Sequence, residues 1–453
     1  MKLYSVIAAT IACIHIVSCS SLPPAQRLLE TQEIELETDG STAMLFHSAL
    51  YYPSAIGLKF PGFIVGIEKS PVETISEEGD IKIQAIPGSG FSKEELFDEV
   101  VDSKILYVSH IIETDGQHYG LSNCALYNAY YRNNQQQSSS PTKYCHNVNQ
   151  LKVSPKNAYL SSWKGMDVLK QTIDERVDQY THVVVVTMGW NTVQEEAVRN
   201  FNSIMKNLKH AAGDAPFNPL FIGVTWPSQW AAKWLEPIVR AVSFPWKAHD
   251  ADEVGLTWLG VLLHKTLADV SKPIVVIGHS FGARATSVAA CIGPAITEHE
   301  TEGERQNKTI DYLINFQGAY RANRLIGKPK DGKLQYPDSC RKNVKNIILT
   351  SSISDTAMDV LFWGKDKYAG DDESYDQQCI DNQNGIRCGK VSKEGNLTII
   401  NHSSSHITYI NADDLINKKS YLSGGNAHSD IYRSEHGVLL WDLLSRQDIN
   451  QYQ

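Results

Sequence analysis

The sequence predicts an α/β protein with a mostly parallel central sheet and helices on both faces. From residue 183 onward, short continuous runs of β-branched and aliphatic residues recur, and helix-like segments separate most of them. Such runs are typical of strands that are buried on both faces of a parallel sheet. Alternating strands and helices imply right-handed crossovers within one sheet. The predicted strands are Val183–Thr187, Leu220–Thr225, Ile274–Ile277, Tyr312–Phe316 and Val344–Leu349.

Size and composition are those of an ordinary globular protein. The 453 residues suffice for one large domain with insertions or for two modest ones. With 42% hydrophobic and 21% charged residues, the chain is neither fibrous nor wholly disordered. A formal net charge of −9 and the lack of a basic face argue against nucleic acid as a partner. Without a phosphate-binding, dinucleotide-binding or zinc-binding motif, we expect no cofactor and no metal.

The N-terminus has the features of an export signal. Lys2 is followed by an apolar run from Leu3 to Val17 that is too short for a membrane-spanning helix. The run ends in Ile16-Val17-Ser18-Cys19, which resembles the lipobox of bacterial lipoproteins. This resemblance implies a signal peptide at 1–18 and a lipid on Cys19. A plain secretory signal that happens to contain a cysteine is the alternative.

The segment at 19–40 is mostly polar and contains Pro23-Pro24, which predicts a tether between the lipid and the folded domain. Ser20 follows the cysteine in place of an aspartate. By resemblance this favours the outer membrane of a bacterial cell envelope, on its periplasmic or its surface face. We therefore expect the membrane to be a partner through the N-terminal lipid.

Residues 41–160 predict a β-rich N-terminal extension. Their strand-like runs, Ile81–Ile86 and Ile105–Val108, are short and are separated by turn residues. The run Asn133–Ser140 contains only Asn, Gln and Ser, so it predicts an exposed loop tip. The α/β domain is expected over 161–453.

Six cysteines remain beyond the signal and the lipid, and an even number suits an oxidising compartment. Spacing favours two local disulfides and leaves one longer pair. Buried free thiols are the alternative, because no spacing matches a zinc site. The favoured pairs are Cys124–Cys145, Cys379–Cys388 and Cys291–Cys340.

The pentapeptide Gly278-His279-Ser280-Phe281-Gly282 lies between a predicted buried strand and a predicted helix. In a turn this tight, side chains two positions before and two after the serine would collide with backbone, so glycine is required at both places. A serine there stands at a helix N-terminus, whose N–H groups stabilise negative charge. Ser280 is therefore the candidate nucleophile, and a mere tight turn is the alternative.

This pentapeptide resembles the nucleophile elbow of α/β-hydrolases such as lipases and esterases. The resemblance extends over about 180–444 and is weak outside the motifs. It implies the α/β-hydrolase fold with an N-terminal extension and insertions. It also implies a catalytic triad in the chain order serine, acid, histidine.

The acid is expected after a strand that follows the elbow. Asp355 lies shortly after the predicted strand Val344–Leu349, at its carboxyl end, where the family's acid commonly lies. Asp359 is the second candidate. Asp355 is also explained as a helix N-cap, which leaves a structural interpretation open.

The base must follow Asp355, and four histidines do. His402 and His406 flank a serine-rich stretch between two possible strands, and His436 falls inside the last predicted helix. His428 lies in a glycine-rich loop before that helix, which resembles the histidine loop of bacterial α/β-hydrolases. We therefore expect His428 to be the base.

Two backbone N–H groups are expected to bind the oxyanion. The sequence Met188-Gly189-Trp190 after the strand Val183–Thr187 resembles the family's His-Gly-x motif, with Met in place of His. The resemblance implies donors at Trp190 and Phe281.

Four tryptophans follow the strand that ends at Thr225, and they predict either a lid and acyl-binding wall or the core of a helical insertion. They are Trp226, Trp230, Trp234 and Trp246.

The motifs predict a serine hydrolase that cleaves acyl esters, either a carboxylesterase or a lipase-like enzyme. Hydrolysis of amides or thioesters is one alternative. A surface-binding protein that has lost catalysis on the same fold is another.

Overall fold

The computed structural model describes most of the chain between residues 58 and 446, and element bounds below refer to these residues. The described residues are 58–69, 81–86, 91–100, 106–114, 123–129, 144–145, 158–189, 194–226, 248–298, 309–326, 337–357, 368–381, 386–401, 403, 405–419 and 427–446.

The strands are β1 (Gly62–Lys69), β2 (Lys82–Ile83), β3 (Leu106–Thr114), β4 (Cys124–Asn128), β5 (His182–Thr187), β6 (Pro219–Thr225), β7 (Ile274–His279), β8 (Ile296–Thr297), β9 (Ile310–Phe316), β10 (Val344–Ser351), β11 (Arg387–Val391), β12 (Leu397–Ile399) and β13 (Ile407–Asn411).

The helices are α3 (Lys93–Val100), α4 (Ala158–Asp174), α5 (Gln194–Ala212), α7 (Trp258–Val261), α8 (Phe281–Cys291), α9 (Pro337–Asn343), α10 (Asp372–Tyr375) and α11 (Ser434–Ser445), with short 3-10 or π turns η4 (Val177–Gln179), η6 (Leu262–Thr266), η7 (Ala322–Arg324) and η8 (Asp376–Ile380).

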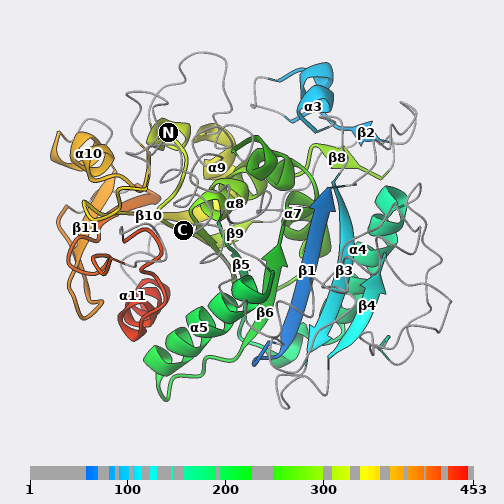
Figure 1. Ribbon diagram of the computed structural model, residues 1–453, viewed down its shortest axis with the longest axis horizontal. Coiled ribbons are helices and arrows are strands. Elements are labelled where there is room, and N and C mark those ends of the chain that lie inside the picture. The colour runs from blue at the N-terminus through cyan, green and yellow to red at the C-terminus, as the bar shows by residue number, and fades with distance from the viewer. Residues whose placement is uncertain are drawn as a thin grey trace, which may run out of the picture.

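One large mixed sheet forms the centre of the molecule (Figure 1). Its 11 strands lie in the order β12-β11-β13-β10-β9-β7-β5-β6-β1-β3-β4. The strands from β11 to β1 in this order run parallel to one another, and β12, β3 and β4 are antiparallel to their neighbours. The α/β class and the mostly parallel sheet predicted from the sequence are therefore confirmed.

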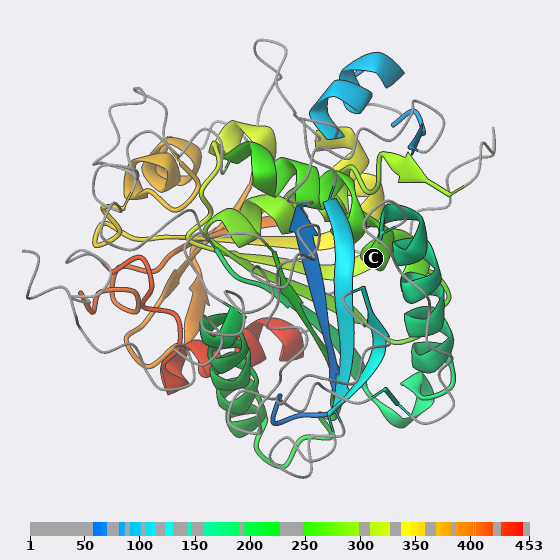
Figure 2. The same ribbon diagram turned by 45° about the vertical axis from the view of Figure 1, so that its right-hand side comes forward.

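The two faces of the sheet carry separate apolar cores, because side chains alternate along each strand. Val183 and Val185 of β5 pack in the core under α4, α7 and α8. Val184 and Val186 pack in the core under α5 and α11. Figure 2 shows these two groups of helices on opposite sides of the sheet. A continuous apolar run is required because both faces of β5 are buried.

The N-terminal region contributes strands to the edge of the same sheet. β1 pairs in parallel with β6, with Gly62 opposite Phe221, and β3 and β4 extend the edge as antiparallel strands. β2 pairs with β8 in a separate two-stranded sheet. Helix α4 begins at Ala158, just before the expected start of the α/β domain at residue 161.

The structure contains the three disulfides that the spacing favoured. Cys124–Cys145 fastens β4 to the segment that follows it, Cys291–Cys340 joins the end of α8 to α9, and Cys379–Cys388 joins η8 to β11. Of the helices described, none has both the length and the apolar character needed to cross a membrane.

Candidate active site

Ser280 is the single residue between β7 and α8, so the chain reverses from strand to helix at this position. Its φ of 58° and ψ of −123° lie in a region that L residues rarely adopt. The Ser280 N–H donates to the carbonyl of Phe316 at 3.0 Å, and the Ser280 carbonyl accepts from Ala319 N–H at 3.1 Å. These bonds hold the strained turn from the neighbouring strand β9.

The two elbow glycines are required by close backbone contacts. A Cβ on Gly278 would lie 2.4 Å from Ala283 Cα, and one on Gly282 would lie 2.3 Å from the carbonyl oxygen of Thr187. Neither neighbour can withdraw, because both are backbone atoms. Gly282 thus lets α8 pack directly against the end of β5.

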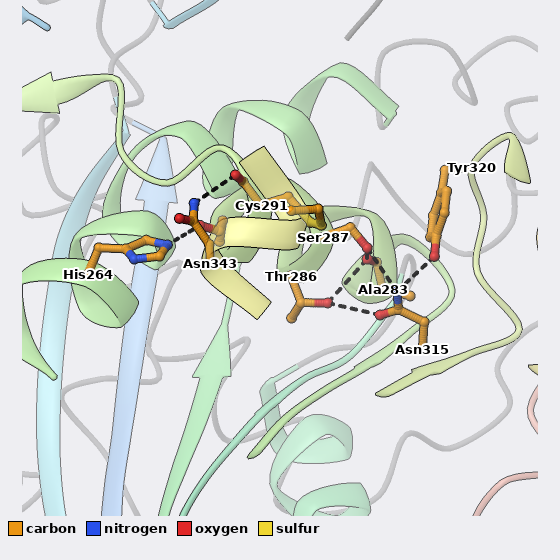
Figure 3. Close-up of a disulfide and its surroundings, with 10 residues drawn as sticks. His264, Ala283, Thr286, Ser287, Cys291, Asn315, Tyr320 and Asn343 are labelled. Atoms are coloured by element: carbon orange, nitrogen blue, oxygen red, sulfur yellow. Dashed lines mark hydrogen bonds between the residues drawn. A yellow bond between two sulfur atoms is a disulfide. The ribbon is translucent and has the colours of Figure 1, made fainter. Parts of the chain in front are cut away.

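Helix α8 is also held by a buried polar network and by a disulfide at its far end (Figure 3). The Asn315 amide on β9 donates to Ser287 Oγ at 2.8 Å and to the Tyr320 hydroxyl at 2.7 Å. Asn343 Nδ2 donates to the carbonyl of Cys291 at 2.9 Å. Helix α8, which begins directly after Ser280, is therefore anchored in its middle and at its end.

Asp355 and His428 lie in contact although 73 residues separate them. His428 Nδ1 and Asp355 Oδ2 are 2.7 Å apart, and both side chains are largely buried. Because a carboxylate accepts hydrogen bonds, Nδ1 carries the hydrogen and Nε2 is left as the basic nitrogen. Ala427 N–H donates to the carbonyl of Ser354 at 3.0 Å and ties the two loops together.

Asp355 remains an anion at this buried position. Burial by itself raises the pKa of a carboxyl, but the positive charge and hydrogen bond of His428, with bonds from Gln317 and the Ala357 N–H, outweigh it. The pKa of Asp355 is therefore lowered from its ordinary value. An ionised carboxylate can both orient the imidazole and stabilise its protonated form.

His279, which precedes Ser280, contacts the loop that carries His428. Its Nε2–H donates to the backbone carbonyl of His428 at 2.8 Å, and the two rings lie 4.9 Å apart. Burial, followed by the charge of His428, lowers the pKa of His279 to about 3. His279 is thus a neutral donor that links the elbow to the loop that carries His428.

The loop after β5 lies against Ser280, where the oxyanion donors are expected. A Cβ on Gly189 would lie 2.5 Å from Ser280 Cβ and 3.0 Å from Ser280 Oγ. The buried Trp226 donates its indole N–H to the carbonyl of Met188 at 2.8 Å, which holds this loop. Phe281 is the first residue of α8. Predicted residues that lie outside the described part are Cys19, Trp190, Trp230, Trp234, Trp246, Asp359 and His402.

The other candidate histidines do not contact Asp355 in the described part of the chain. His436 is buried in α11 beside Phe316, and burial lowers its pKa to about 4. His406 directly precedes β13, and burial likewise lowers its pKa to about 4.

Two features of this region carry no signal in the sequence. Gln317, after β9, donates from Nε2 to Asp355 Oδ2 at 2.9 Å. Asp252 accepts from Arg284 of α8 at 2.7 Å and from Arg324 of η7 at 3.0 Å. Both depend on contacts between distant segments, and neither residue type stands in a recognisable motif.

The described residues contain one group of side chains with the spacing of metal ligands. It comprises Glu113, Cys124 and Cys145, whose donor atoms lie within 4.8 Å of one another. Both sulfurs belong to the Cys124–Cys145 disulfide, so they are not thiolate ligands. This group lies on β3, on β4 and on the segment after β4, away from the elbow in the strand order.

Comparison with known proteins adds no relative: no family model matches the chain, and neither the curated proteins nor the solved structures contain a significant match.

Proposed function

We propose that this protein is a serine hydrolase that cleaves acyl esters, as a carboxylesterase or a lipase-like enzyme. The observation that carries the proposal is the 2.7 Å contact of His428 Nδ1 with Asp355 Oδ2, in a site whose serine stands at a strand-to-helix elbow. Strands β5, β7 and β10 run parallel, so Gly189, Ser280 and Asp355 all lie beyond the carboxyl ends of the strands, on the same side of the sheet's strand ends.

The proposed reaction proceeds in two halves. His428 Nε2 takes the proton of Ser280 Oγ as this oxygen attacks the ester carbonyl, and the oxyanion binds the N–H groups of Phe281 and Trp190. The bond to the alcohol breaks, and His428 returns the proton to the leaving oxygen. Water, deprotonated by His428, then attacks the acyl-enzyme and releases the acid with Ser280 restored.

Labelling by a fluorophosphonate tests the nucleophile directly. We expect the probe to label the parent on Ser280 and not to label Ser280→Ala, whose ester turnover falls on the order of 10⁶-fold. Ser203→Ala, on the exposed surface of α5, is the control and retains labelling. A folded parent that takes up no label would exclude the hydrolase and favour the surface-binding alternative.

A substrate panel distinguishes the classes of acyl bond. We expect p-nitrophenyl esters to be hydrolysed faster than matched anilides and thioesters, with chain length separating carboxylesterase from lipase-like activity. Faster turnover of an anilide or thioester than of the matched ester would replace ester hydrolysis by the corresponding alternative.

We also propose a lipid anchor at Cys19 and a place in the bacterial outer membrane, on the strength of the lipobox resemblance. Fatty-acid labelling in a bacterial host should mark the parent and not Cys19→Ala. A parent without label would leave only a plain export signal, and equal labelling of both would exclude Cys19 as the lipidated residue.

A further inference from the structure

Gln317 occupies an unusual place in the backbone. Its φ is 47°, and among the described residues only Gln317 and Ser280 combine a positive φ with a side chain. Conformations of this kind cost on the order of 1–3 kcal/mol and persist where surrounding contacts enforce them. Both strained residues lie in the candidate active site, directly after the carboxyl ends of the adjacent strands β7 and β9.

The buried amide of Gln317 is fully occupied by hydrogen bonds. Nε2 donates to Asp355 Oδ2 at 2.9 Å and to the carbonyl of Gly370 at 3.1 Å, and Oε1 accepts from Thr350 Oγ1 at 2.9 Å. A carbonyl only accepts, so the contact with Gly370 identifies the nitrogen as the end that faces Asp355. The orientation of the amide is thus determined from two sides.

The same turn holds the backbone of the nucleophile. Phe316, just before Gln317, accepts the N–H of Ser280 at 3.0 Å, and Ala319, just after it, donates to the Ser280 carbonyl at 3.1 Å. One short segment therefore contacts Ser280 through its backbone and Asp355 through its side chain. A shift of this segment moves both groups relative to His428.

We propose that Gln317 is a positioning residue of the hydrolase, which acts through Asp355. The N–H of Gln317 donates to one lone pair of Asp355 Oδ2 and so restrains rotation of the carboxylate. The other lone pair of Oδ2 then accepts the N–H of His428 Nδ1. An amide suits this task because it donates without ionising. The inference rests on the proposed function.

Substitution by glutamate converts the contact into a pH-dependent one. The carboxyl of Gln317→Glu has the length of the amide, and two carboxyls this close retain one proton between them. The shared proton preserves the hydrogen bond to Asp355, whereas the second hydrogen bond of the amide, to the Gly370 carbonyl, is lost. When the proton is lost, repulsion displaces Asp355 from His428. The described titratable groups that face this position are Asp355, His428 and, behind them, His279.

We therefore expect kcat of Gln317→Glu to fall as the pH rises through the pKa of this pair, with KM unchanged. The parent should not show this fall in kcat at high pH. Gln317→Asn serves as the second variant, because asparagine tolerates a positive φ but its amide is one methylene too short to reach Asp355. Its kcat should fall about 10- to 100-fold at every pH.

Asn346→Asp is the matched control. Asn346 is a buried amide near the amino end of β10, and it donates to the carbonyl of Asp311 and not to Asp355. This variant places a comparable buried carboxyl away from the candidate site, and its kcat should not fall as the pH rises.

Rates of fluorophosphonate labelling and ester hydrolysis, measured against pH for folded proteins, decide between the outcomes. The inference is overturned, and the proposed function is not, if the parent is labelled but Gln317→Glu keeps the pH profile of the parent and Gln317→Asn keeps its full kcat. A fall in kcat of Asn346→Asp at high pH overturns the inference too, because the effect is then general to buried carboxyls. A parent that is not labelled overturns the proposed function and the inference together. If Gln317→Glu does not fold, kcat of Gln317→Asn decides.

Discussion

Asp355 shows how a single carboxylate can be held in one orientation by its surroundings. His428 and Gln317 donate to Oδ2 at 2.7 and 2.9 Å, and the Ala357 N–H donates to Oδ1 at 3.1 Å. Hydrogen bonds to charged groups each contribute about 1.5–3 kcal/mol. Loss of one of these bonds loosens the carboxylate, whereas loss of the charge removes the partner on which the His428 tautomer depends.

Asp355→Asn should lower kcat about 10⁴-fold with the fold retained, because an amide can favour the wrong imidazole tautomer. Steady-state ester hydrolysis beside a thermal unfolding curve measures this. Asp414→Asn is the control, since that exposed carboxylate pairs with Lys390 at the surface. Equal activity of Asp355→Asn and the parent would make Asp355 structural and move attention to Asp359.

At the scale of elements, the packing of the loop after β5 against the elbow controls the space around Ser280. Gly189→Ala should reduce kcat/KM at least about 10²-fold, because its Cβ would lie 2.5 Å from Ser280 Cβ and displace the proposed nucleophile. Gly213→Ala is the control, for its φ is +56° and no atom lies within 4 Å of the added Cβ.

Gly213→Ala therefore incurs only the backbone cost of about 1–2 kcal/mol and leaves activity unchanged. Urea unfolding measures the loss of stability in each variant, and ester hydrolysis measures the loss of activity. A Gly189→Ala variant that loses stability but keeps activity would contradict the expected role of this loop.

A second contact between elements is the buried cluster that joins α8, η7 and residues 248–256. Burial raises the pKa of Asp252, but the charges of Arg284 and Arg324 outweigh it and lower the pKa to about 2. A lowered pKa stabilises the fold above the unfolded value of 3.8, and this contribution is lost as the pH falls toward about 2.

Asp252→Asn should lower the free energy of unfolding by about 3–5 kcal/mol at neutral pH, because two buried guanidinium groups lose their counter-ion. Between pH 6 and pH 3 the parent should lose on the order of 1 kcal/mol more than the variant. Urea titrations at both pH values measure this difference. Parallel losses in the two proteins would show that Asp252 is not linked to proton uptake.

The elbow could be predicted from local sequence because it needs glycine at two fixed positions between an apolar strand and a helix. Gln317 could not, since glutamine has no tendency toward a positive φ and its turn is enforced by contacts from β7 and β10. Asp252 and Arg284 likewise meet only through tertiary packing.

At the scale of the whole molecule, apolar runs predicted five of the parallel strands, β5, β6, β7, β9 and β10, to within two residues, as in Tyr312–Phe316 for β9. The parallel strands β1, β11 and β13 were not among these predictions. Strand order carries no such signal. Nothing local indicates that β1 lies beside β6, or that β11 and β12 are inserted in the chain between β10 and β13. These arrangements depend on pairing between distant segments. Asp355 and His428 are joined only because β13 returns beside β10.

The disulfides restrain the whole chain, and their loops differ in length. Cys291–Cys340 closes 49 residues and Cys379–Cys388 closes 9. By loop entropy their removal should cost about 4 and about 3 kcal/mol of unfolding free energy. Double Cys→Ala variants, compared with the oxidised parent by urea unfolding, should therefore rank in this order. Cys291 and Cys340 are also buried, so lost packing increases the gap. A larger loss from the shorter loop would show that unfolded-chain entropy does not govern their stability.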